Sequence, residues 1–244
     1  MEPALYNLTT AALFVLLFTG ARTAVRQETI PHRRIPWAAI TVTAIAIAAV
    51  LTQLLWPPTM GALDADPGKA GWWRPLTSTF MQNSGVSGTL WNIVTLAVIA
   101  ALAEWIWGTA VMLAIFLAGA LVPAHLDALF GLGSVSLDPR NFAGSSGATY
   151  FLGAASAAVL LLRARASSER LRSLTALAAG LCLWLVQANA HGLVVVYGYV
   201  VGLAAWTVLG PLLRADRDRR RPRKTVGDVL ALLPARKSST ARQI

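Results

Sequence analysis

A serine and a histidine, each at the start of an apolar segment, are the residues of this sequence best suited to chemistry. Ser146 lies between glycines in the stretch from Gly144 to Tyr150, and His191 follows Ala190. A serine hydroxyl beside an imidazole is the nucleophile and general base of covalent hydrolysis, in which the imidazole accepts the hydroxyl proton during attack on a carbonyl. This chemistry requires that two separate segments bring the side chains together.

Small residues follow both side chains at intervals of 7 and 11 positions: Gly153 and Ala157 after Ser146, and Gly198 and Gly202 after His191. At 3.6 residues per turn, these intervals place each set on one narrow face of a helix. Small residues let two transmembrane helices approach closely, and Gly198 and Gly202 form a GxxxG pair. We therefore expect the two faces to pack together with Ser146 and His191 at equal depth. Tyr150, one turn below the serine, is expected to support the imidazole ring.

Other residues are weaker candidates for chemistry. His125 is a rival base, but a histidine at a helix boundary is typical of contact with lipid headgroups. Asp127 and Asp138 would have to converge to act as a pair, and nothing in their spacing requires it. Cys182 is the only cysteine, which excludes an intrachain disulfide. The sequence has no P-loop and no HExxH motif, so no cofactor or metal is expected.

The composition is that of a polytopic membrane protein. Of the 244 residues, 56% are hydrophobic and 13% are charged, whereas soluble domains are roughly 45–50% apolar and about 25% charged. Six apolar segments form the expected core, at residues 37–56, 86–103, 109–125, 146–162, 171–186 and 192–213. A spanning helix needs about 20 residues, so each segment is near the length that crosses a bilayer.

A further apolar segment begins at Leu5 and has two interpretations. It could be a secretory signal peptide, but the residues before it include Glu2 and no Lys or Arg, whereas signal peptides begin with a positively charged region. We expect a retained helix. The chain then divides into an N-terminal helix with a basic cytoplasmic loop (1–36), a six-helix membrane core (37–213) and a basic, disordered cytoplasmic tail (214–244).

Basic residues are divided unevenly between the connections: four Arg in residues 22–36, four in 163–172 and ten Lys or Arg from Arg214 onward, against only Lys69, Arg74 and Arg140 elsewhere. The positive-inside rule assigns the connections that are rich in Lys and Arg to the cytoplasmic side. The N-terminus is therefore expected outside the plasma membrane and the C-terminus inside. The net charge is +10, and the ten basic residues of the tail favour anionic lipid as its partner. The tail lacks the aromatic residues on which nucleic-acid bases stack, so no nucleic-acid partner is expected.

Further motif residues occur in order along the six-segment core. They are Trp73-Arg74 in the first outer connection, Asn92, Glu104 and Gly108 along and after the second segment, Gly144, Ser146, Gly147 and Tyr150 at the fourth, and Ala190-His191 with Gly198 and Gly202 at the sixth. This series resembles the rhomboid family of intramembrane serine proteases and covers the whole core. The resemblance implies an all-α, polytopic membrane protein with a six-helix rhomboid-like core, to which this chain adds one N-terminal helix.

The resemblance also implies an activity. Ser146 would be the nucleophile and His191 its base, in a dyad without an aspartate. Asn92 would help to hold the oxyanion, and Tyr150 and Gly147 would support the dyad. The substrate would be another protein, cleaved without a cofactor in or near a transmembrane helix at the outer side of the bilayer.

Structural roles are implied for Trp73, Arg74, Glu104, Gly198 and Gly202. One alternative is a non-catalytic rhomboid-like protein that binds transmembrane helices. Gly88 favours it, because the family often has an oxyanion-donating histidine there, for which Gln82 or Asn83 could substitute. Val194 also favours it, because a glycine is expected at that position. A third interpretation, a small transporter, would require charges near the middle of the segments, where the sequence has none.

Overall fold

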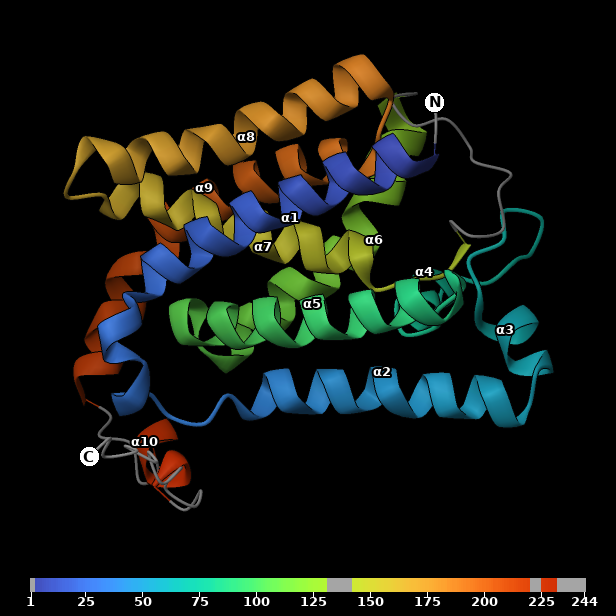
Figure 1. The fold of residues 1–244 in the computed structure, drawn as a ribbon, viewed down its shortest axis with the longest axis horizontal. Coiled ribbons are helices and arrows are strands. Elements are labelled where there is room, and N and C mark those ends of the chain that lie inside the picture. The colour runs from blue at the N-terminus through green and yellow to red at the C-terminus, as the bar shows by residue number, and fades with distance from the viewer. Residues whose placement is uncertain (1–2, 131–141, 220–224, 232–244) are drawn as a thin grey trace, which may run out of the picture.

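The computed structural model describes residues 3–130, 142–219 and 225–231, and these are almost entirely helical. The long helices are α1 (Pro3–Val25), α2 (Trp37–Leu55), α5 (Gly85–Trp107), α6 (Thr109–Phe130), α7 (Ser146–Arg163), α8 (Ser167–Gln187) and α9 (Ala190–Arg219). Four short helices lie between or after them: the 3-10 helix η1 (Gln27–His32), α3 (Pro58–Leu63), α4 (Arg74–Ser78) and α10 (Val226–Leu230). Figure 1 shows most of the long helices side by side, with α2 and α8 at opposite edges.

Five of the described helices, α1, α2, α5, α7 and α9, are long and apolar enough to cross a membrane. The expected all-α, multi-pass membrane protein is therefore confirmed. Seven spans were expected, and the remaining two helices differ from the five in composition. α6 has a shorter apolar stretch, Thr109–Pro123, and α8 begins with the charged residues Glu169, Arg170 and Arg172.

Helix α7 is the centre of the molecule. Every residue from Ala148 to Leu160 is buried, and α7 contacts α1, α5, α6, α8 and α9. Its sequence is rich in Ala, Gly and Ser, and such small side chains allow neighbouring backbones to approach closely. The first turn of α7, which carries Ser146, is therefore held in place by packing along the whole length of the helix.

The expected glycine face of α9 packs against α7. A Cβ atom on Gly198 would lie 2.8 Å from the Cα atom of Phe151, and one on Gly202 would lie 2.5 Å from the Cα atom of Ala155. Both glycines are therefore required for the close approach of the two backbones. The partner face on α7 differs from the predicted one, because it contains Phe151 and Ala155.

The face of α7 predicted to meet α9 meets α1 instead. A Cβ atom on Gly153 would lie 3.4 Å from Leu17 Cβ, and one on Gly20 would lie 2.9 Å from Ala157 Cβ. This part of the prediction is wrong, and the reason is physical. A helix buried on all sides has several faces that suit a neighbour, so the spacing of small residues does not select one.

Glu104 joins two helices at the end of α5 that is farther from Asn92. Its carboxylate accepts hydrogen bonds from the backbone N–H of Ala39 (2.9 Å) and from the hydroxyl of Thr109 (2.7 Å). Ala39 lies in the first turn of α2, where backbone N–H groups have no partner within the helix. Gly108 ends α5 with a φ of 77°, a conformation that favours glycine. Glu104 thus links α5 to the first turn of α2 and to the first residue of α6.

Arg74 organises the connection between α2 and α5. Its guanidinium group donates to the backbone oxygen of Asp64 (2.9 Å) and to its carboxylate (3.2 Å). Lys69 forms a second ion pair with Asp64 at 2.9 Å. Trp73 is exposed beside Trp72, with the two rings edge to face. The connection is therefore a defined structure rather than a loose loop.

The same connection fixes the chain just before α7. The N–H of Ala65 donates to the carbonyl of Phe142 (2.8 Å), and the N–H of Gly144 donates to the carbonyl of Ser78 (3.0 Å). These bonds set the path by which the chain enters the helix that begins at Ser146.

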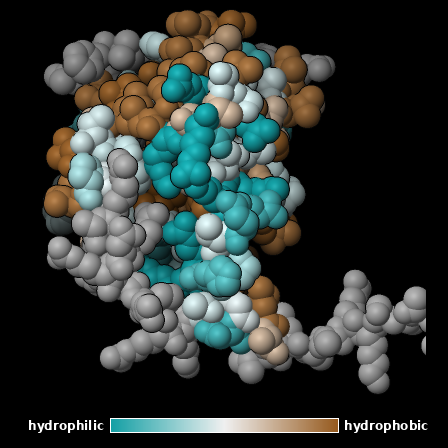
Figure 2. Space-filling model, turned by 90° about the vertical axis from the view of Figure 1, so that its left-hand side faces the viewer, coloured by the Kyte–Doolittle hydropathy of each residue, from teal (hydrophilic) through white to brown (hydrophobic). Residues whose placement is uncertain are grey.

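The basic connections gather at the opposite end, where α1 ends and α8 begins. Figure 2 looks onto this end and shows hydrophilic residues between hydrophobic flanks. Helix α10 also lies here, since Val226 donates its N–H to the carbonyl of Arg33 (2.8 Å). Within the segment predicted as the basic tail, residues 214–219 continue α9 and residues 225–231 contain α10.

Candidate active site

Ser146 faces a small polar space made by a glycine. Gly144 has a φ of 153°, which side chains other than glycine rarely adopt. A Cβ atom on Gly144 would lie 3.6 Å from Asn92 Nδ2, 3.7 Å from Ser146 Oγ and 3.9 Å from Gln82 Oε1. The space that this carbon would fill is thus shared by one hydroxyl and two amide side chains.

A buried amide network surrounds this space. Asn92 donates from Nδ2 to Gln82 Oε1 (2.7 Å), and Gln82 donates from Nε2 to Ser145 Oγ (3.3 Å). Gln53 anchors Gln82 by accepting its backbone N–H (3.2 Å) and donating to its carbonyl (2.8 Å). Because an amide nitrogen carries two hydrogens, Asn92 keeps one N–H beyond the bond to Gln82. Gln82 therefore orients Asn92, and one of the two N–H groups of Gln82 is bonded to Ser145.

The two adjacent serines differ. Ser145 is fully buried and its hydroxyl belongs to the amide network. Ser146 is partly exposed, and its hydroxyl makes no hydrogen bond with any residue that the structure describes. Of the two hydroxyl groups, that of Ser146 is the less buried and lies outside the network.

His191 lies in the first turn of α9. Asn189 accepts the backbone N–H of His191 at 2.9 Å and so caps the helix. The imidazole packs on the ring of Tyr150, with 4.8 Å between the ring centroids and 59° between the planes. The hydroxyl of Tyr6, on α1, lies 3.2 Å from Nδ1 of His191. Two tyrosines from different helices therefore hold the ring.

Ser146 and His191 lie at the same end of neighbouring helices, and Tyr150 connects them. Tyr150 is one turn after Ser146 on α7 and touches the imidazole. No hydrogen bond joins Ser146 to His191 in the described part of the chain. Catalytic hydrogen bonds are often long before substrate binds and shorten in the complex, so this arrangement is compatible with a dyad.

Helix α1 contributes to the site, which sequence reasoning missed. Thr10 accepts a hydrogen bond at its carbonyl from the Tyr150 hydroxyl (2.8 Å) and at its hydroxyl from Asn189 (3.0 Å). Thr9 donates to Gln187 at 3.0 Å. The N-terminal helix is therefore joined to α7 and to the turn between α8 and α9.

A sequence signal for this role existed. Tyr6, Thr10, Leu13 and Leu17 occur at helical spacing, so the polar pair lies at one end of an apolar face. Polar side chains within a membrane helix are costly unless they meet a partner. The pattern indicates that α1 packs on other helices, although it does not identify His191 as the partner.

Gly88 and Val194 are the two departures from the pattern that the resemblance implies. A Cβ atom on Gly88 would overlap the Cβ of Ser84, so a larger side chain at this position would require Ser84 to move. Val194 is buried, yet α9 still meets α7 at Gly198. Val194 therefore does not hold the two helices apart.

The remaining candidates lie away from the dyad or add little to it. A Cβ atom on Gly147 would have no atom within 4 Å. His125 is exposed on α6 and its Nδ1 lies 2.7 Å from the carbonyl of Leu121, in its own helix. Asp138, Arg140 and the side chain of Asp127 lie outside the described residues. Among the described residues, no group of three or more His, Cys, Asp or Glu could hold a metal ion.

Comparison of the sequence with protein-family models and with curated proteins finds no match. The functional assignment therefore depends on the geometry of the site and on the motif residues themselves.

Proposed function

We propose that this protein is an intramembrane serine protease of the rhomboid type. The observation that carries the proposal is that the hydroxyl of Ser146 and the amide of Asn92 both border the space at Gly144, at the same end of the helix pair as His191 on Tyr150. A nucleophile, an oxyanion donor and a base are the groups that peptide-bond hydrolysis through an acyl-enzyme requires.

In this mechanism the Ser146 hydroxyl attacks the peptide carbonyl and His191 accepts the hydroxyl proton at Nε2. The remaining N–H of Asn92 donates to the oxyanion that forms. The imidazolium then gives its proton to the leaving amine, and a water molecule, deprotonated by His191, releases the acyl group from Ser146. Every proton is returned, so no cofactor takes part.

Tyr6 has a positioning role in the proposal. When Nδ1–H of His191 donates to the Tyr6 oxygen, Nε2 is left as an acceptor and can take the serine proton. The bond length of 3.2 Å is that of a neutral hydrogen bond. A carboxylate has this task in many serine hydrolases, and here a hydroxyl on α1 takes its place.

The proposed substrate is a transmembrane helix of another protein. Helical hydrogen bonds keep its carbonyls from the serine, so the helix must unwind locally before cleavage. Gly or Pro near the outer boundary favours such unwinding. The positive-inside rule supports an outward-facing site in the plasma membrane, because the arginine-rich connections lie at the other end of the helices.

A second candidate is a non-catalytic protein that binds transmembrane helices. The observation that favours it is α1 itself, a spanning helix seated along α7 with hydrogen bonds at the site end. In this alternative Tyr6 would occupy His191 permanently, and a bound helix would be retained intact.

Labelling with a fluorophosphonate, which forms a covalent bond with activated serines, distinguishes the protease from the non-catalytic binding protein. The purified full-length protein in detergent is expected to be labelled, and Ser146→Ala to be unlabelled. Ser156→Ala is the matched control and should retain labelling, because Ser156 lies on the same helix, bonded to Trp107 rather than to any residue of the site. Labelling that survives in Ser146→Ala would remove the proposed nucleophile.

A further inference from the structure

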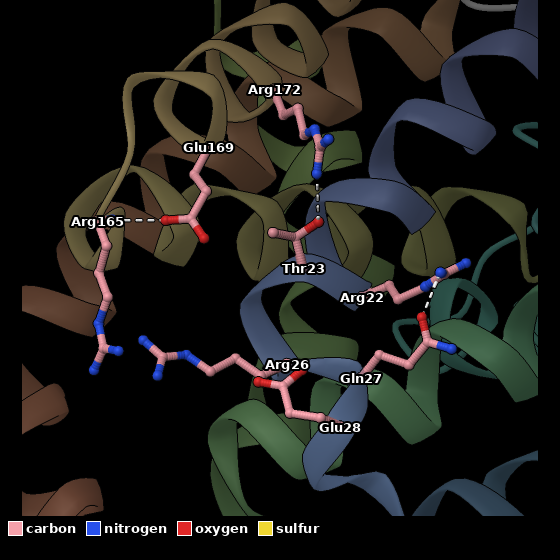
Figure 3. Close-up of a pocket in the computed structure, with 8 residues that line it drawn as sticks. All are labelled: Arg22, Thr23, Arg26, Gln27, Glu28, Arg165, Glu169 and Arg172. Carbon is pink, nitrogen blue, oxygen red and sulfur yellow. Dashed lines mark hydrogen bonds between the residues drawn. The ribbon is translucent and has the colours of Figure 1, made fainter.

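A pocket lies at the arginine-rich end, far from the dyad. It has a volume of about 400 Å³ and is lined by Arg22, Thr23, Arg26, Gln27, Glu28, Arg165, Glu169 and Arg172. The last turn of α1 and the start of η1 form one wall, and the connection from α7 into α8 forms the other (Figure 3). Four arginines against two glutamates leave the pocket with an excess of positive charge.

Two of the arginines face the pocket without a counter-ion. The guanidinium groups of Arg26 and Arg165 are directed toward the same part of the pocket (Figure 3). Neither forms a salt bridge or a side-chain hydrogen bond with any described residue. Like charges that share a partly enclosed space repel each other, and an anion between them would replace this repulsion by attraction.

The other two arginines are held by neutral groups. Arg22 donates to the side-chain oxygen of Gln27, and Arg172 donates to the hydroxyl of Thr23 at 3.5 Å. Neutral acceptors orient a guanidinium group and leave its charge uncompensated. None of the four arginines forms an ion pair with a described residue, so their guanidinium groups can still bind an anion.

Glu169 is committed to the backbone. Its carboxylate accepts the N–H of Arg165 at 2.6 Å and that of Ala166 at 3.4 Å, at the start of α8. The Arg165 N–H is the main cause that lowers the pKa of Glu169, and the charges of Arg26 and Arg165 lower it further. The carboxylate therefore stays ionised and limits the pocket's positive charge without forming an ion pair there.

The backbone brings Arg26 to this position. Helix α1 ends at Val25, and Arg26 has a φ of 64° before η1 begins at Gln27. This left-handed corner is unusual for a residue other than glycine or asparagine. It turns the chain between α1 and η1, both of which line the pocket.

We propose that this pocket binds a phosphate group, and that the group belongs to the headgroup of an anionic phospholipid. Guanidinium groups bind phosphate oxygens through paired, charge-assisted hydrogen bonds. The position favours a lipid source, because the pocket lies at the end of the α1 span, where headgroups meet the apolar layer. The site is independent of the protease proposal and of the basic tail.

The test measures lipid binding by native mass spectrometry of the full-length protein in a neutral detergent. The probes are dioleoyl phosphatidylglycerol, dioleoyl phosphatidylcholine and inorganic phosphate as a competitor. We expect the dissociation constant for phosphatidylglycerol to be at least tenfold lower than that for phosphatidylcholine. Arg26→Gln and Arg165→Gln should each raise the constant for phosphatidylglycerol about tenfold.

Two further variants make the test specific. Arg170→Gln removes one positive charge from α8 outside the pocket, so it should change the constant less than twofold. Glu169→Gln keeps acceptors for the backbone N–H groups and removes a negative charge, so it should tighten binding. This gain stays measurable even if an arginine variant fails to fold.

The outcomes are distinct. Competition by millimolar inorganic phosphate, lost in Arg26→Gln, would support the phosphate site and assign it to the free ion rather than to lipid. Equal weakening of phosphatidylglycerol binding by Arg170→Gln and Arg26→Gln would overturn the proposal, because binding would then depend on the total charge at the arginine-rich end rather than on the pocket. Equal affinity for the two lipids, or absence of saturable binding by both phosphatidylglycerol and phosphate, would overturn it as well.

Discussion

At the scale of single residues, two glycines three positions apart have different tasks. Gly144 has a φ of 153° and borders the space shared by Ser146, Asn92 and Gln82. Gly147 is helical, and a Cβ there would have no atom within 4 Å. Gly144 is required by its backbone conformation and by its place in the site. At Gly147, by contrast, a larger side chain would meet no neighbouring atom.

Alanine at the two positions is therefore expected to have opposite effects on stability. Gly144→Ala places a side chain in a disfavoured conformation, so it should destabilise the protein by about 1–3 kcal/mol. Gly147→Ala should leave stability unchanged or raise it by up to about 1 kcal/mol, because alanine favours a helix. Thermal unfolding in detergent measures both, and equal destabilisation by the two variants would contradict this account of Gly144.

Tyr6→Phe tests the positioning role of the α1 hydroxyl. The variant keeps the ring beside His191 and removes the partner of Nδ1, so we expect the fluorophosphonate labelling rate to fall on the order of tenfold. Tyr199→Phe is the matched control. It removes a buried hydrogen bond to Ser173 (2.8 Å), about 12 Å along α9 from His191.

The control should lower thermal stability and leave the labelling rate near that of the wild type. A Tyr6→Phe protein that is labelled faster than the wild type would mean that Tyr6 restrains His191, and the positioning role would be wrong.

From side-chain type and spacing the sequence singled out Ser146, His191 and Tyr150, and the structure places them at one end of α7 and α9. Their catalytic roles stay predictions, and the groups around them were harder to foresee. Tyr6 and Gln82 act through partners that are distant in sequence. A single polar side chain in an apolar helix indicates a contact, but only the packed fold identifies its partner.

At the scale of helices, the glycines of α9 set the distance to α7. We expect Gly198→Ala and Gly202→Ala each to destabilise the protein by about 1–3 kcal/mol, because the added carbon meets the backbone of α7, which has little room to move. Gly61→Ala is the control, since its Cβ would lie 3.7 Å from Lys69 Nζ, an ordinary contact.

Chemical denaturation in mixed micelles measures the free energy of unfolding of the three variants. A loss in Gly61→Ala as large as that in Gly198→Ala would contradict the close-packing account of the α7–α9 contact.

Helix positions were largely predictable, because apolar length and proline or glycine boundaries are local properties. The predicted start of the first core segment at Trp37 and of the fourth at Ser146 match α2 and α7. The partners of each face were less predictable. Gly153 and Ala157 of α7 were expected to contact α9. They contact α1 instead, because α7 is buried on every side and has several faces that suit a neighbour.

At the scale of the whole molecule, the candidate active site and the arginine-rich connections lie at opposite ends. The site gathers at the starts of α1, α7 and α9, and the arginines gather where α1 ends and α8 begins. If the basic end faces the cytoplasm, a reporter fused after Ile244 will report a cytoplasmic position, and one fused before Met1 will report an external position. The reverse pattern in whole cells would contradict an outward-facing site.

The central claim is that Ser146 and His191 together cleave a peptide bond in a membrane. The most direct measurement reconstitutes the full-length protein in liposomes with reporter proteins whose single transmembrane helix carries Gly or Pro near its outer boundary, and identifies the products by mass spectrometry. We predict cleavage near that boundary by the wild type and by His125→Ala, which removes the rival histidine, and no cleavage by Ser146→Ala or His191→Ala. Cleavage that persists in Ser146→Ala, or wild-type protein that binds the reporters and leaves all of them intact, would contradict the account.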